Sequence, residues 1–134
     1  MSSINWLAVL VAAIIQFVIG WAWYSPYLFG RKWLALKGAG ADPMKGQSPA
    51  KAMAGSFVAG LISAAVLAYM VVLTGVTTVG GGLWLGTLLW LGFVGAVMIT
   101  DVLFDGKKPG LYLISAGYFL VAFALMGAVL AVWQ

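Results

Sequence analysis

The sequence contains no cysteine, no histidine and no glutamate. Without cysteine the chain has no disulfide, no thiolate nucleophile and no cysteine ligand for a metal. Without histidine it also lacks the commonest metal ligand and the side chain most often used as a general base. We therefore expect a protein that is not an enzyme and has no metal or cofactor, although the composition allows bound lipid.

Charged residues are scarce as well. They make up 7% of the 134 residues and hydrophobic residues 64%, against roughly 25% and 45–50% in an ordinary soluble domain. These values exclude a soluble domain and indicate a polytopic membrane protein. The net charge of +4 comes from lysines and arginines beside apolar runs. In that position membrane lipids, and not nucleic acid, are the expected partner.

Four apolar runs are each long enough to cross a hydrocarbon core of about 30 Å as a helix. We predict spans at 4–24, 49–73, 83–100 and 111–133 in a single domain. The third span is predicted to begin only at 83, because the run Gly80-Gly81-Gly82 disfavours helix. Short connections make successive helices antiparallel neighbours, so the pattern predicts an all-α bundle of four transmembrane helices.

The basic residues predict the orientation of this bundle. Segment 25–51 holds five of the seven lysines and arginines, and segment 101–110 holds the other two. Cytoplasmic loops of membrane proteins carry such an excess of basic residues. We therefore expect loops 25–48 and 101–110 on the cytoplasmic side and both chain ends on the outer side.

A short segment after the first span mixes bulky apolar residues with cations, from Tyr27 to Lys37. This mixture predicts an amphipathic segment that lies in the membrane interface. Arg31, Lys32 and Trp33 are candidates for binding lipid headgroups, although general attraction to anionic lipid explains the same residues. Aromatic residues near the span ends are expected to be interface anchors, with cation–π recognition of a quaternary amine as the alternative.

Small residues recur along the second, third and fourth spans. In lipid, close packing of helices depends on small residues that let two backbones approach. The candidates for helix packing are Ser56, Gly60, Ala64, Gly86, Gly117 and Gly127. The same faces are suited to packing within the chain, to a homo-oligomer, or to a place in a larger membrane complex.

Polar residues inside a span are candidates for function, because they cost free energy in lipid. The candidates are Asn5, Gln16, Ser63 and Thr87. Gln16 is the only amide near mid-membrane, and an interhelical hydrogen bond is the favoured interpretation of it. A role in lining a solute path is the alternative.

Asp101 and Asp105 stand four residues apart, which places both carboxylates on one face if the third helix extends that far. Such a pair can share a proton or hold a cation. A hard metal ion needs more oxygen ligands than two carboxylates provide, so a solvated helix end is favoured over an ion or proton site.

Several short motifs along the chain resemble one family. They are Asn5-Trp6-Leu7-Ala8, the block from Trp23 through Ser25-Pro26 and Phe29-Gly30 to Trp33, Gly92-Phe93 and Gly117-Tyr118. Together they are similar to the bacterial integral membrane family called domain of unknown function 1761. The resemblance covers nearly the whole chain and implies a small multi-span protein of a bacterial cytoplasmic membrane. It implies no activity and no site residues.

Two hypotheses for function follow. The first is a non-enzymatic accessory, scaffold or lipid-interacting subunit, because packing faces are abundant and reactive groups are few. The second is a small oligomeric carrier or channel for a neutral or lipophilic solute. Substituting Gln16 by leucine distinguishes them, since flux is lost in a carrier and only stability changes in a scaffold.

Overall fold

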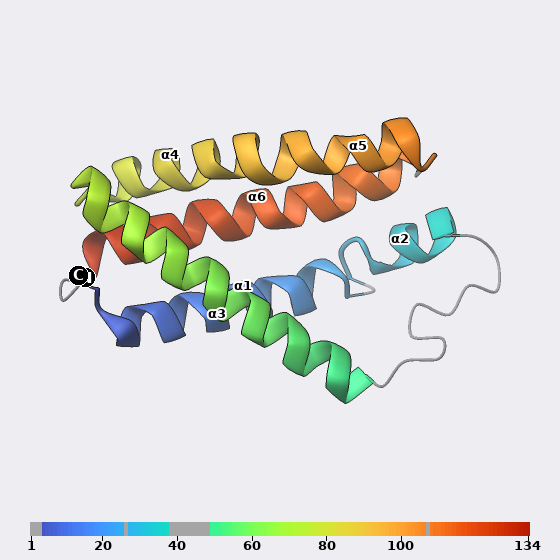
Figure 1. Ribbon diagram of the computed structural model, residues 1–134. Coiled ribbons are helices and arrows are strands. Elements are labelled where there is room, and N and C mark those ends of the chain that lie inside the picture. The colour runs from blue at the N-terminus through green and yellow to red at the C-terminus, as the bar shows by residue number, and fades with distance from the viewer. Residues whose placement is uncertain (1–3, 26, 38–48, 107) are drawn as a thin grey trace.

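The computed structural model describes residues 4–25, 27–37, 49–106 and 108–134, and in these residues the chain is helical with no strand (Figure 1). Four helices are long and apolar enough to cross a membrane. This confirms the predicted all-α, four-span class. The elements are α1 (Trp6–Trp23), α2 (Gly30–Lys37), α3 (Pro49–Thr74), α4 (Val79–Trp90), the π-helical turn η1 (Leu91–Gly95), α5 (Ala96–Phe104) and α6 (Pro109–Val132).

The start of α1 explains one of the polar residues. The Oδ1 atom of Asn5 accepts hydrogen bonds from the backbone N–H groups of Leu7 at 3.1 Å and Ala8 at 3.2 Å. These donors have no partner within the helix, so an asparagine at this position caps it. Asn5, a candidate for function by its position in the sequence, is therefore the N-cap of α1.

The third span is longer than predicted. It runs without interruption through α4, η1 and α5 from Val79 to Phe104, so the predicted start at 83 was four residues late. Thr78 caps it by accepting a hydrogen bond from the N–H of Gly81 at 3.0 Å. The three glycines lie inside the helix, because a close contact with α6 outweighs their low helix propensity.

That contact joins α4 to α6. A Cβ atom built on Gly82 would collide with the backbone carbonyl of Gly127, and one built on Gly86 would collide with the carbonyl of Phe123. The two backbones therefore touch, because Gly82, Gly86 and Gly127 have no side chains that would hold the helices apart. Gly86 and Gly127 are buried here. Gly117 lies farther along α6, where an added Cβ atom would stand 3.3 Å from the ring of Trp23.

Helix α6 is the centre of the bundle, since it contacts α1, α2, α3, α4 and α5. Figure 1 shows α4 and α5 alongside α6 over its length, whereas α3 crosses α1 and diverges from the other helices toward its first residues. The start of α1, the end of α6 and the link after α3 lie at one end of the bundle. Helix α2 and the link between α5 and α6 lie at the other, which we call the α2 end.

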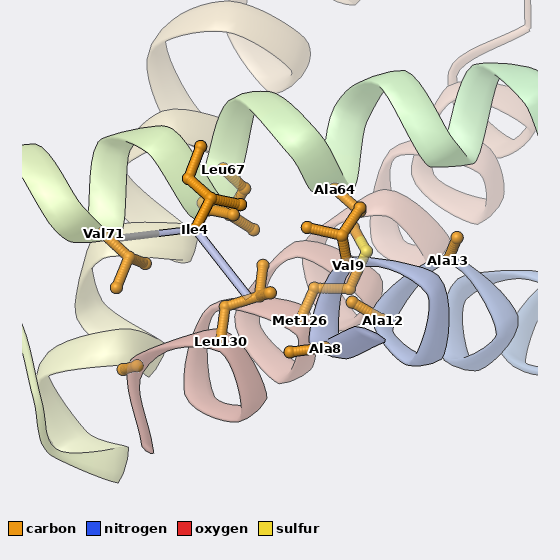
Figure 2. Packing of buried hydrophobic residues seen from close by; sticks show 12 residues of the cluster. Ile4, Ala8, Val9, Ala12, Ala13, Ala64, Leu67, Val71, Met126 and Leu130 are labelled. Atoms are coloured by element: carbon orange, nitrogen blue, oxygen red, sulfur yellow. The ribbon is translucent and has the colours of Figure 1, made fainter. Parts of the chain in front are cut away.

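The packed core lies toward the end of the bundle opposite α2. Small residues of α1, among them Ala8 and Ala12, meet Leu67 and Val71 of α3 and Met126 of α6 (Figure 2). Gly60 and Ala64 of α3 are also buried. Because α3 diverges from α1 before Gly60, Ser56 is exposed in the single chain. Packing of Ser56 against a second copy or another subunit stays a prediction.

Candidate functional site

A groove of about 440 Å³ lies where α3 diverges from α1. Its residues are mostly apolar or aromatic and come from three helices: Gln16, Phe17, Gly20, Trp21 and Tyr24 from α1 and its end, Ala52, Met53, Ser56, Ala59 and Gly60 from α3, and Tyr118 and Phe119 from α6. Trp21 is 72% exposed and Met53 50% exposed. The groove therefore opens on the flank of the bundle, which is the surface that faces lipid in a membrane-spanning chain.

Glycines shape the inner end of this groove. A Cβ atom on Gly60 would stand 3.6 Å from the Oε1 of Gln16, so the amide of Gln16 lies directly against the α3 backbone. On the other side, a Cβ on Gly20 would stand 3.1 Å from the hydroxyl of Tyr118. The absence of side chains at these two positions leaves room for the amide and for the tyrosine ring.

Gln16 is the one polar residue among the buried side chains that the structure describes, with 7% of its surface exposed. Its Oε1 atom is buried and has no hydrogen-bond partner among the described residues. The expected interhelical hydrogen bond of this side chain is therefore not made by Oε1. Its backbone carbonyl is bonded across helices, accepting from the Tyr118 hydroxyl at 3.0 Å, and the Gln16 side chain also interacts with that hydroxyl.

Aromatic side chains at the end of α1 form hydrogen bonds to α6. The indole N–H of Trp23 donates to the carbonyl of Ile114 at 2.9 Å, and the hydroxyl of Tyr24 donates to Ser115 Oγ at 3.1 Å. The sequence interpretation of these residues as interface anchors missed their hydrogen bonds to α6.

The two carboxylates of the third span lie away from the groove. Asp105 follows the last residue of α5 and is exposed, and its N–H donates to the carbonyl of Asp101 at 3.1 Å. Among the described residues no group of three acidic, histidine or cysteine side chains is placed to hold a metal ion. The arrangement is that of a helix end.

The remaining polar and basic candidates are dispersed. The hydroxyl of Thr87 donates to the carbonyl of Leu83 in its own helix at 2.7 Å, so it is satisfied locally. Ser63 lines a second groove, of about 410 Å³, between α3, α4 and α6. On α2, Arg31 and Lys32 are exposed, and the Trp33 ring packs edge-on against Tyr24 with 5.6 Å between centroids.

A family model described as "Protein of unknown function (DUF1761)" matches residues 7–131. This chain belongs to that family. The match confirms the resemblance seen in the sequence and covers all four spans of this DUF1761 protein nearly completely. No curated protein and no solved structure matches the chain significantly.

Proposed function

We propose that this chain is a non-enzymatic membrane protein that binds a lipid-like molecule in the groove between α1 and α3. The observation that carries the proposal is the groove itself, which is apolar, partly enclosed and open on the lipid-facing flank. Its volume lies in the range of roughly 300–1,000 Å³ found for pockets that bind small ligands. Its lining matches such pockets too, because a few polar groups stand among aromatic and aliphatic side chains.

The setting of the groove fits a role as an accessory or scaffold subunit, in a homo-oligomer or a larger complex of a bacterial cytoplasmic membrane. The groove lies toward the α2 end of the bundle, where Arg31 and Lys32 are exposed. If basic segments 25–48 and 101–110 face the cytoplasm, as the positive-inside rule predicts, both chain ends face outward. The groove then opens to the inner leaflet, and Arg31 and Lys32, beside Trp33, are placed to attract anionic headgroups.

A pair of glycine substitutions on α3 tests the proposal. We expect Gly60→Leu to fill the groove, because the new side chain begins in contact with the Gln16 amide. Native mass spectrometry of protein extracted with its lipids should then show at least about a tenfold loss of retained lipid-like ligand, a change that corresponds to ~1.4 kcal/mol.

Gly55→Leu is the matched control, because a Cβ at Gly55 meets no atom within 4 Å and Gly55 does not line the groove. This variant should retain the ligand as the unmodified protein does. Equal retention by both variants would show that bound lipid lies elsewhere on the protein and would contradict the proposal.

One further observation favours a small carrier as the second candidate. The groove occupies the α2 half of the bundle, while the opposite half is filled by the core around Leu67 and Met126. A carrier whose binding site lies toward one side of the membrane, with the other side closed by packed side chains, has such an arrangement. Flux of a neutral solute into proteoliposomes that Gln16→Leu abolishes would favour the carrier over a fixed binding site.

A further inference from the structure

We propose that the occupant of the groove is an uncharged lipid alcohol, a hydrocarbon molecule whose hydroxyl group binds the side-chain amide of Gln16. This inference rests on the proposed function, since it specifies the ligand of the same groove. It is carried by one buried polar atom, Oε1 of Gln16, which has no hydrogen-bond partner among the described residues.

The first step concerns the hydrogen bonds that Gln16 lacks. Gln16 is buried, with 7% of the residue exposed, and its Oε1 has no partner among the described residues. The hydroxyl of Tyr118 donates its proton to the Gln16 backbone carbonyl, so that proton is not available to Oε1. A buried polar atom is nearly always bonded to protein or to an ordered water molecule, and beside an apolar groove a ligand hydroxyl group can take the place of that water.

The second step concerns the type of group that fits. The amide of a glutamine presents both an acceptor oxygen and a donor nitrogen, and a half-turn of its last side-chain bond exchanges their places. A hydroxyl group both donates and accepts. It therefore satisfies the amide of Gln16 in either orientation, which an ether or an ester oxygen does not.

The third step concerns charge and depth. None of the lining residues is a lysine, arginine or aspartate, so a phosphate or carboxylate beside Gln16 would be buried without a counter-charge. Gln16 also precedes the last residue of α1, Trp23, by seven positions. At about 1.5 Å per residue it lies roughly 10 Å inside the span, below the level of charged headgroups. The group that reaches it belongs to an uncharged, mostly hydrocarbon molecule.

The second groove serves as an internal comparison. It has nearly the same volume, about 410 Å³, but Ser63 is the only polar residue in its lining. The linings of both grooves are mostly apolar, as a hydrocarbon chain requires. The hydroxyl of Ser63 can also bond an alcohol, but only the groove at Gln16 has in its lining a buried acceptor atom that lacks a partner among the described residues. We therefore expect the stronger preference for an alcohol over an alkane there.

The test compares 1-hexadecanol with hexadecane, which has the same chain and no hydroxyl group. Each is titrated into micelles of the full chain labelled with ¹⁵N in glutamine and ¹³C in methionine methyl groups. The methyl signal of Met53, which lines the groove, reports occupancy by either molecule. The side-chain amide signal of Gln16 reports the hydrogen bond, and Gln134, bonded to Val76 at the far end of the bundle, is the reference.

We expect the alcohol to bind about tenfold more tightly than the alkane, as one hydrogen bond to a buried group predicts. Only the alcohol should shift the Gln16 signal. In Gln16→Leu the two molecules should bind equally, whereas Ser63→Ala, in the second groove, should keep the tenfold preference.

Equal binding of both molecules with an unmoved Gln16 signal would overturn the inference and leave the groove as a site for apolar guests. A Met53 signal that responds to neither molecule would overturn the inference together with the proposed function. Both results come from the unmodified chain, so the test does not depend on the folding of a variant.

Discussion

Substituting Gly82 by alanine should destabilise the protein by about 3 kcal/mol or more, near the upper end of overpacking effects. The added Cβ would overlap the backbone carbonyl of Gly127. Backbone atoms cannot rotate away as a side chain does. To make room for the added methyl group, α4 must therefore move away from α6. Steric-trapping or denaturant unfolding in micelles measures the loss.

The control for this prediction is Gly80, two residues before Gly82 in the same helix. A Cβ on Gly80 meets no atom within 4 Å, and its φ angle is not positive. Gly80→Ala should therefore be neutral or stabilise the protein by roughly 0.5–1 kcal/mol, because alanine favours helix and restricts the unfolded chain. Similar effects of the two substitutions would contradict the backbone contact between α4 and α6.

Substituting Gln16 by leucine should stabilise the protein, by about 1–2 kcal/mol. The physical reason is that a buried acceptor without a hydrogen bond costs about 1–3 kcal/mol, and Oε1 of Gln16 is such an acceptor. Leucine is apolar and of roughly similar volume, so it removes the unpaired acceptor without leaving a large cavity. The unfolding free energy of ligand-free protein in micelles is the quantity to compare.

Gln134→Leu is the contrasting variant, because the amide nitrogen of Gln134 donates to the carbonyl of Val76 at 2.8 Å. Its removal should lower stability slightly. A loss of stability in Gln16→Leu comparable to that of a broken interhelical bond would show that the Gln16 amide is paired after all. A gain in stability together with a loss of alcohol binding is the result expected of a ligand-binding residue.

The four spans were predictable because a membrane-crossing helix requires about 20 apolar residues, and runs of that length are visible in the sequence. The start of the third span was not, since the contact between Gly82 and Gly127 joins residues far apart in the sequence. Local propensity describes the glycines as helix breakers, while the bundle uses them as contact points. The exposure of Ser56 was not predictable from the sequence for the same reason, since it depends on the path of α3 relative to the other helices.

The sequence also identified Gln16 as the central polar candidate, because amides are rare at mid-membrane. It did not predict the groove, which depends on how far α3 diverges from α1 and on the position of Tyr118 from α6. Asn5 and Thr87 shared the same sequence signal, but the structure shows them bonded to backbone groups of their own helices. A polar residue inside a span is a candidate for function, and its hydrogen bonds in the structure then show whether it is already satisfied by its own helix.

The most direct test of the account is a nuclear Overhauser measurement on ¹⁵N-glutamine-labelled protein in lipid bicelles. The central claim is that the groove at Gln16 opens to lipid on the flank of the bundle. We predict cross-peaks from the Gln16 side-chain amide protons to hydrocarbon protons of the lipid, which disappear when the lipid chains are deuterated. Cross-peaks to protein protons alone would mean that α3 closes on α1, and would contradict the claim.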